Sequence, residues 1–267
     1  MKTTLAELTT GERELPLPIR LVSDWHLGHP GSRVESIAQV EYLLEGVGTF
    51  VMVGDGREEL VEGWRARADE LWNELQEACR SRGIVFVALT GNHDPGVSSE
   101  GWLKLFAGRI LVTHGDMIYE TASPWSRELF SNRQAVSDFL AERACQSLND
   151  RWRCAQEVGR LLRPKEKMPC HFLGYLKLAL WPPERLLEVG RVWAGFAKEA
   201  GKFAEVFSAE SEVVICGHFH RPGEFVVGER RVWNLGSLMK MSKALALDVD
   251  EEGIRSLVVQ LLSLIHI

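Results

Sequence analysis

Short apolar runs that stop at polar residues recur along this chain. The run Ile84–Leu89 has the length of a buried strand, about six residues, and it stops at Thr90-Gly91-Asn92-His93-Asp94. A strand that ends at a glycine and presents an amide, an imidazole and a carboxylate is typical of the carboxyl end of a sheet, where open α/β sheets keep their ligand sites. Runs of the same form occupy residues 19–23, 49–53, 109–113 and 212–216. Helical spacing in about 33–46 and 58–82 lies between the first of them, so the pattern predicts an α/β fold.

A different pattern occupies residues 120–210. Its apolar spacing is helical, prolines interrupt it, and no strand is convincing there. Strand-like residues 224–234 follow the last apolar run, and 244–249 with 254–262 predict a hairpin. We therefore predict one main domain with a helical insertion and two short flanking segments. The predicted boundaries are an N-terminal arm at 1–18, the domain at 19–262, its insertion at about 120–210 and a tail at 263–267.

Composition supports one globular domain and excludes some partners. The chain has 267 residues, of which 45% are hydrophobic and 25% charged, as in soluble globular proteins. A net charge of −6 gives no general affinity for nucleic acid or anionic lipid. No apolar stretch approaches the roughly 20 residues that span a bilayer, and the N-terminus lacks the apolar core of a signal peptide. We therefore expect a cytoplasmic protein without a transmembrane segment.

The cysteines indicate reduced thiols. Five are present, an odd number with no CxxC pair, which argues against a disulfide framework. Cys170 precedes His171 and invites comparison with a metal or nucleophilic site, but burial as a small hydrophobic residue is the more common role. The set is Cys79, Cys145, Cys154, Cys170 and Cys216.

The residues after five predicted strands carry the candidate chemistry. Each end alone is common turn or capping chemistry, and a single histidine there is more often a core residue than a ligand. Together they place Asp, His and Asn side chains at one strand end after another, and side chains at i and i+2 of an extended segment point to the same side. The ends are Asp24-Trp25-His26, Gly54-Asp55, Gly91-Asn92-His93-Asp94, His114-Gly115-Asp116 and Gly217-His218-Phe219-His220.

These residue types predict a pair of metal ions. Imidazole with carboxylate suits Mn, Fe and Zn, and the absence of cysteine argues against a thiolate site. Seven ligands around a shared carboxylate fit two divalent ions about 3.5–4 Å apart, which can activate a bridging water and hold a phosphoryl oxygen. The neighbouring glycines allow tight turns and leave room for an anion.

The motifs resemble those of the calcineurin-like metallophosphoesterases, whose pattern is D-x-H, GD, GNH[DE], H and GHxH. The resemblance covers about 19–119 and 212–240 and implies a two-layer β-sandwich flanked by helices. It implies metal ligands in two sets that share one residue. The first set is Asp24, His26, Asp55 and His220, and the second is Asp55, Asn92, His114 and His218.

The same resemblance implies catalytic roles for two neighbouring residues. His93 would protonate the leaving group or stabilise the transferring phosphoryl group, and Asp94 would orient the His93 imidazole. The family often continues its second motif as GDxxDRG, whereas this chain has Gly56-Arg57-Glu58-Glu59 after Asp55, which disfavours a protein phosphatase. Arg57 is a weak candidate for binding substrate phosphate, and a solvent-facing helix start is its alternative role. His29 and Asp116 are near the site in sequence and are weak candidates for supporting roles.

The insertion is expected to set specificity. Ten Lys or Arg and six Asp or Glu fall between Arg127 and Lys177, so the segment is locally basic in an acidic chain. It serves either as a structural cap or as a lid with an apolar groove beside phosphate-binding arginines. The lid layout and Gly217-His218-Phe219-His220-Arg221-Pro222 resemble the UDP-2,3-diacylglucosamine pyrophosphatases. Those enzymes have arginine in place of His93, and the stretch 234–237 is instead similar to broader phosphodiesterases.

Taken together, these features predict an enzyme. The expected reaction is hydrolysis of a phosphodiester, pyrophosphate or phosphomonoester by metal-bound hydroxide, with Mn favoured and Fe or Zn as alternatives. The expected partner is a phosphorylated small molecule or a lipid-linked substrate, and the second implies peripheral contact at the inner membrane face. The rivals are a non-catalytic metal-binding scaffold and a nuclease or nucleotide phosphodiesterase. The acidic balance weighs against large nucleic acids.

Overall fold

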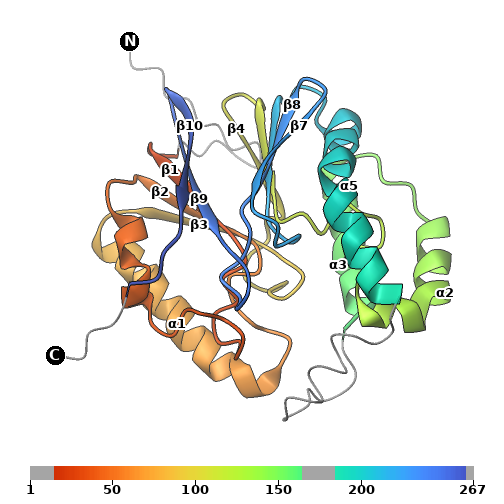
Figure 1. Ribbon diagram of the computed structural model, residues 1–267, viewed down its shortest axis with the longest axis horizontal. Helices are drawn as coiled ribbons and strands as arrows, with labels where there is room; N and C mark the ends of the chain where they lie inside the picture. The colour runs from red at the N-terminus through yellow and green to blue at the C-terminus, as the bar shows by residue number, and fades with distance from the viewer. Residues whose placement is uncertain (1–14, 164–183, 263–267) are drawn as a thin grey trace.

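The computed structural model describes residues 15–163 and 184–262. Two five-stranded β-sheets face each other, and helices cover their outer faces (Figure 1). This is the predicted two-layer sandwich. The N-terminal arm up to residue 14, the tail from 263 and part of the insertion, which includes Cys170, lie outside the described residues.

The first sheet contains the strands that precede three of the predicted ligand loops. Its order is β10-β9-β1-β2-β3, with β1–β2 and β2–β3 parallel and the other two pairs antiparallel. Parallel neighbours end at the same edge of a sheet, so the residues after β1, β2 and β3 meet there. The strands are β1 (Ile19–Val22), β2 (Thr49–Val53), β3 (Val85–Leu89), β9 (Leu245–Asp250) and β10 (Gly253–Val258).

The second sheet brings the remaining two ligand loops to the same end of the molecule. Its order is β4-β5-β6-β8-β7, and β5, β6 and β8 are mutually parallel. Expected strand-like residues 224–234 form the hairpin β7–β8. The strands are β4 (Trp102–Leu105), β5 (Ile110–Thr113), β6 (Val213–Cys216), β7 (Gly223–Val227) and β8 (Arg230–Asn234).

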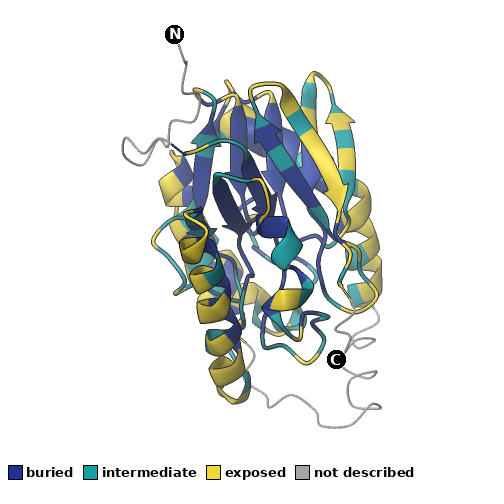
Figure 2. Cartoon of the chain, turned by 90° about the vertical axis from the view of Figure 1, so that its left-hand side faces the viewer, coloured by how far each residue is buried: buried dark blue, intermediate teal, exposed yellow. Residues whose placement is uncertain are grey.

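The main core lies between the sheets. Leu21, Val53 and Leu89 of the first sheet pack with Val112 and Ile215 of the second, all at 5% exposure or less. Separate apolar layers join each outer face to its helices. Figure 2 shows the buried central strands, and β10 at the sheet edge is mostly exposed. Strands β1, β2, β5 and β6 are buried along their whole length, which explains why their sequences read as continuous apolar runs.

The helices that precede and follow β2 differ from the expectation. Residues 33–46 form two short 3-10 helices, η1 (Ile37–Gln39) and η2 (Glu41–Leu44), instead of one helix. Ser36 caps the start of η1, and Gln39 at its end completes the capping box, so the box spans this single turn. Helix α1 (Glu62–Ser81) begins four residues later than expected. The N–H groups of Glu58 and Glu59 bond instead to the carbonyls of Leu27 and His93, at 3.1 and 3.0 Å.

The described part of the insertion is helical, as predicted. It comprises α2 (Arg127–Ala141), α3 (Leu148–Leu161) and α5 (Glu184–Phe207), and α5 packs on the second sheet. Helix α3 is tied to the core at two points. Trp152 Nε1 donates to Thr90 Oγ1 at 2.8 Å, and Arg151 Nε donates to the carbonyl of Met117 at 2.8 Å. No helix among the described residues has the length and apolar character that crossing a membrane requires.

Candidate metal centre

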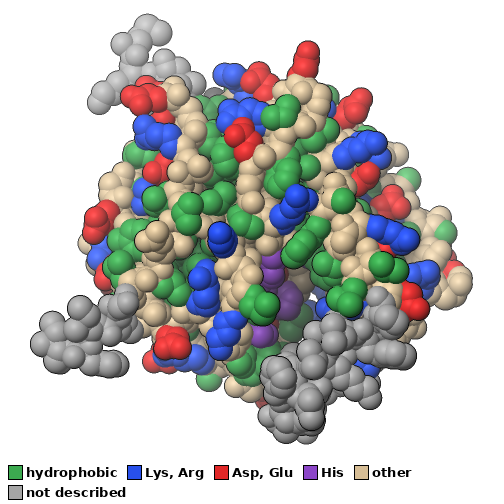
Figure 3. Space-filling view, viewed as in Figure 1, with side chains coloured by type: hydrophobic (Ala, Val, Ile, Leu, Met, Phe, Trp, Pro, Cys, Tyr) green, Lys and Arg blue, Asp and Glu red, His purple; other side chains and the backbone are tan. Residues whose placement is uncertain are grey.

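The five predicted ligand loops meet at the carboxyl ends of the parallel strands. Figure 3 shows histidine side chains gathered in a hollow on this side of the molecule. The backbone is strained at the same place, because Asp24, His26, Asp55, His218 and His220 all have φ between 47° and 66°. Residues with a Cβ atom adopt this region at a cost of about 1 kcal/mol or more each. Such strain is common at functional sites, where the surrounding structure holds the side chains in place.

The first ligand set forms one compact group. Asp24, His26 and His220 each offer a donor atom, and these atoms lie within 4.8 Å of one another. The Asp24 carboxylate lies 3.0 Å from His220 Nε2 and accepts the backbone N–H of His218 at 2.9 Å. Burial opposes the charge on Asp24, but the hydrogen bond from His220 and the nearby His114 ring lower its pKa. The structure thus brings together three of the four residues of this predicted set around one point.

The second set surrounds Asp55. Asp55, His114 and His218 form another group within 4.8 Å, and His114 Nε2 lies 3.3 Å from Asp55 Oδ2 and 3.2 Å from Asn92 Oδ1. The Nδ1 atom of His114 lies 3.1 Å from the carbonyl of Val53, so its proton sits there and Nε2 is left for a ligand. Burial and the adjacent His114 ring lower the pKa of His218 to about 3, which keeps this imidazole neutral.

A buried polar atom tests whether these residues fit a metal. His26 Nε2 is enclosed and has no hydrogen-bond partner within residues 15–163 and 184–262, while it lies 3.9 Å from Asp24 Oδ1 and 3.8 Å from Asp55 Oδ2. A buried nitrogen that lies between two carboxylates and makes no hydrogen bond destabilises the fold unless it coordinates a cation. The donors are imidazole and carboxylate, which suit Mn, Fe and Zn. The residues therefore fit a divalent metal, and Asp55 and His26 each belong to two overlapping groups.

Glu58 is a site residue that the sequence analysis missed. Its buried carboxylate contacts two imidazoles, at 2.9 Å from His26 Nδ1 and 3.0 Å from His93 Nδ1. Burial disfavours the charged imidazole of His26, but the hydrogen bond to Glu58 and the charges of Asp55 and Glu58 together outweigh burial and raise the pKa of His26. Burial also lowers the pKa of His93, but the charges of Glu58 and Asp55 outweigh burial and raise this pKa to about 10. Holding Nδ1 of each ring leaves Nε2 to face the site.

Asp94 contacts backbone groups, and its orienting role towards His93 stays a prediction. Its carboxylate accepts the backbone N–H groups of Asp55, Gly56 and Gly91 at 2.9, 2.7 and 2.8 Å. Burial, together with repulsion from Asp55, raises the pKa of Asp94 to about 7 against these hydrogen bonds. Asp94 therefore fixes the two loops that carry Asp55 and Asn92, and the contact with the His93 ring is made by Glu58.

The three weak candidates occupy different positions around the centre. The Arg57 guanidinium pairs with Glu59 and with Asp69, at 2.6 Å for the second, and Arg57 lies before the start of α1. His29 Nδ1 accepts the backbone N–H of Gly31 at 2.7 Å. Asp116 Oδ2 is buried and has no hydrogen-bond partner in the part of the chain that the structure describes.

Two features of the chain allow the loops to approach so closely. A Cβ atom at Gly217 would collide with the Ser23 hydroxyl and the Asp24 carboxylate, so only glycine fits between the β1 and β6 loops. The end of β8 and the residues after it fix the same loops from the other side. The Ser237 hydroxyl donates to the Asp24 carbonyl at 3.0 Å, and Asn234 donates to the Gly217 carbonyl.

Comparison with known proteins gives a likeness of fold. No family model matches the sequence, and no curated protein matches it. A dimetal phosphatase from Danio rerio is 10% identical with a TM-score of 0.44, covering 92% of this chain and 99% of that one. Zinc-complexed wild-type Vps29 from Entamoeba histolytica is 11% identical with a TM-score of 0.40, covering 91% and 98%. An archaeal phosphodiesterase is 14% identical with a TM-score of 0.37, covering 91% and 100%.

Proposed function

We propose that this chain is an enzyme that binds two divalent metal ions and hydrolyses a phosphodiester, pyrophosphate or phosphomonoester. One observation carries the proposal. The Asp55 carboxylate lies between His26 on one side and His114 on the other, and it belongs to one donor group with His26 and His93 and to another with His114 and His218. His26 in turn links Asp55 to the group of Asp24 and His220. A carboxylate shared in this way is the feature that distinguishes a two-ion site from a single one. Asp24 and His220 complete one side, and Asn92 and His218 the other.

The residues around the centre have distinct tasks. When bound, two divalent ions neutralise charge on phosphoryl oxygens and lower the pKa of a coordinated water. Asp55 and Asp24 supply the negative charge that holds the ions, and Glu58 fixes the His26 ring so that Nε2 faces them. We favour Mn and retain Fe and Zn, because the oxygen and imidazole donors suit all three.

His93 is the candidate proton donor to the leaving oxygen. Its side chain is 37% exposed, whereas the side chains of Asp55 and His114 are at most 2% exposed. The His220 side chain is similarly exposed, at 34%, but His220 belongs to the donor group of Asp24 and His26. Nδ1 of His93 is held by Glu58, so Nε2–H is the atom that can meet a substrate. The carboxylates that raise its pKa to about 10 keep the ring protonated near neutral pH, as an acid requires.

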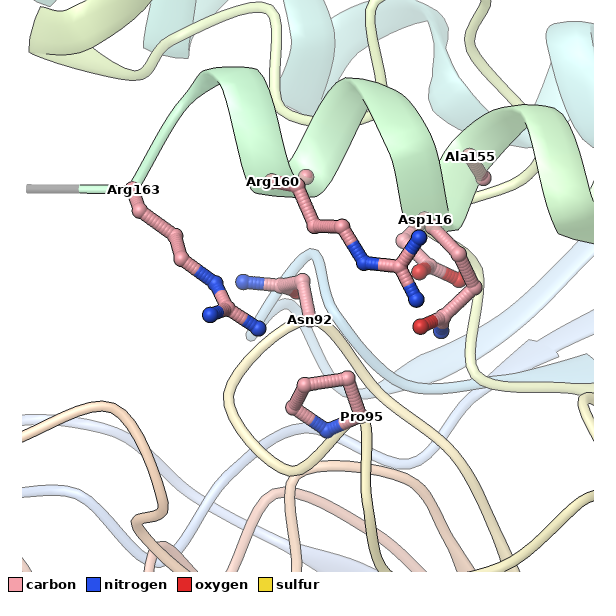
Figure 4. A pocket seen from close by; sticks show the side chains of 8 residues that line it. Asn92, Pro95, Asp116, Ala155, Arg160 and Arg163 are labelled. Carbon is pink, nitrogen blue, oxygen red and sulfur yellow. The ribbon is translucent and has the colours of Figure 1, made fainter.

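The insertion supplies the side chains on which substrate specificity would depend. Arg160 of α3, which also pairs with Glu157, and Arg163 just after this helix extend towards the loop that carries Asn92 and Pro95 (Figure 4). Arginine at such a position recognises phosphate through several hydrogen bonds at once. The substrate we propose therefore carries an anionic group on the Asn92 side of the reacting phosphorus, as a pyrophosphate or a lipid-linked nucleotide sugar does.

A metal-dependent hydrolysis panel tests the proposal. The purified chain would be assayed with Mn²⁺ against a model phosphodiester, nucleotides, a phosphoprotein and a lipid-linked UDP sugar. Asp55→Asn should lower turnover of any hydrolysed substrate by at least about 100-fold, the scale of losing a key charged group in a catalytic site. Metal content should be about two ions per wild-type chain and lower in the variant.

The control is Asp138→Asn, the same change on an exposed position of α2. It should keep both metal content and activity. A folded wild-type chain that binds no metal would support the scaffold instead, and hydrolysis that persists after metal removal would exclude the proposed chemistry.

A further inference from the structure

A second cavity lies at the helical insertion, apart from the predicted metal ligands. Its volume is about 640 Å³, within the range of sites that hold small molecules. It is open to solvent on one side and is lined by the end of α2, the loop 143–145, α3, the second half of α5 and residues 118–121. None of the predicted ligands lines it, and it shares no lining residue with the space beside Asn92.

Arg151 is the unusual residue of this cavity. Its side chain is buried, with only 5% of the residue exposed, and Nε donates to the carbonyl of Met117 at 2.8 Å. Among the residues that the structure describes, no carboxylate forms an ion pair with its guanidinium, and the remaining N–H groups have no protein acceptor. A buried cation without a counter-charge is costly to a protein. An anion in the cavity would supply that charge.

The charges around Arg151 favour an anion. Arg143 also lines the cavity, with its guanidinium 3.7 Å from the centre of the Phe139 ring. Arg143, Arg151 and Cys154 all line this cavity. Lys202 is already paired with Glu199 at 2.8 Å. Of the lining charges without an ion pair among the described residues, two are therefore positive and one, Glu120, is negative.

The opposite wall is apolar. Leu140, Phe203, Val206 and Phe207 line it, and the rings of Phe203 and Phe207 are 5.1 Å apart. Val206 is 72% exposed, an unusual degree for a branched aliphatic side chain next to a cavity. A ligand with an apolar body would cover this surface while its charged end reached Arg151 and Arg143.

We propose that the cavity binds an anionic amphiphile, with a carboxylate or phosphate on the two arginines and an acyl chain against the apolar wall. The two head groups share the chemistry that arginine recognises, and the experiment distinguishes them. The proposal does not depend on the hydrolytic function, because every residue that carries it lies outside the metal centre.

Thiol protection provides a readout at the cavity itself. Cys145 lines the cavity, is partly exposed and is a free thiol. Dodecyl phosphate and dodecanoate, each below its micelle concentration, should slow alkylation of Cys145 by iodoacetamide, followed by peptide mass spectrometry. Inorganic phosphate and neutral dodecyl maltoside should protect little, since each lacks one half of the proposed ligand. The probe that protects at lower concentration identifies the preferred head group.

Variants connect protection to the arginines. Arg143→Gln should weaken binding of the anionic probe by at least about tenfold, the scale of a lost charge-assisted hydrogen bond. Arg151→Lys keeps the charge at the buried position but loses the guanidinium geometry, and should also weaken binding. Arg153→Gln, an exposed position of α3 outside the cavity, is the matched control and should bind as the wild type does. Equal protection by dodecyl maltoside, or unchanged binding in both variants, would overturn the proposal.

Discussion

The carboxylate of Glu58 lies 3.0 Å from Nδ1 of His93. The same carboxylate contacts His26, a predicted ligand, so one buried acid orients both the candidate proton donor and a metal ligand. Neither contact requires the metal. This arrangement makes Glu58 the most informative residue to change outside the ligands themselves.

Glu58→Gln should lower metal affinity or turnover by about 10- to 100-fold, as changes at residues that hold ligating histidines commonly do. The amide is neutral, and its NH₂ group can face Nδ1 as a donor, so it no longer fixes Nε2 towards the site. Metal titration and kcat at saturating metal would measure the two effects. Glu59→Gln is the matched control, because Glu59 bonds to Arg57 and to the N–H of Gly96. Equal behaviour of the two variants would contradict the assigned role.

Asp94→Asn should act on stability rather than on the His93 ring. The carboxylate accepts three backbone N–H groups, and an amide has a single acceptor oxygen and would turn a donor towards one of them. We expect the free energy of unfolding of the metal-free protein to fall by about 1–3 kcal/mol. Urea denaturation would measure it, with Asp138→Asn expected to stay within about 0.5 kcal/mol of wild type. Full stability with a large loss of kcat would support the orienting role for Asp94.

The sequence was sufficient for the strands that precede the candidate ligands, although strand β4 (Trp102–Leu105) was not predicted. Strands such as Val213–Cys216 are buried on both faces, so burial leaves a continuous apolar run that is visible without the fold. The position of the polar residues after each run then follows from the parallel order of the strands. Parallel strands end at the same edge of their sheet, and these edges of the two sheets lie at the same end of the molecule. Local patterning and topology agree here, which is why five separate motifs converge.

Glu58 and Asp94 could not be assigned in the same way. The apolar stripe of α1 predicted a helix from residue 58. Long-range backbone hydrogen bonds to Leu27 and His93 instead keep residues 58 and 59 out of the helix. In this position the Glu58 carboxylate contacts the rings of His26 and His93. A signal was present, since Glu58 stands where GDxxDRG has its second acid. Asp94 follows His93 directly, yet its side chain points to the β2 loop, and adjacency in sequence does not predict that.

Arg160→Gln and Arg163→Gln test the proposed substrate side of the site. For a substrate with a second anionic group, each should raise KM by about tenfold, the scale of one charge-assisted hydrogen bond, with kcat nearly unchanged. A simple phosphodiester should respond much less. Arg153→Gln controls for the loss of one positive charge from α3. Similar kinetics of all three variants with the larger substrate would show that the insertion does not bind it.

His29 should make stability depend on pH in a defined window. Burial lowers its pKa to about 4, and Nδ1 accepts the N–H of Gly31, which requires the neutral ring. The unfolded chain titrates near the ordinary value of about 6.5, so it binds the proton first as pH falls. Stability is therefore fully present above about pH 6.5 and falls as pH drops towards 4, by at most about 3 kcal/mol. His29→Gln should remove this part of the slope. The free energy of unfolding of both metal-free proteins at pH 7 and pH 5 would measure it, and parallel slopes would refute the assignment.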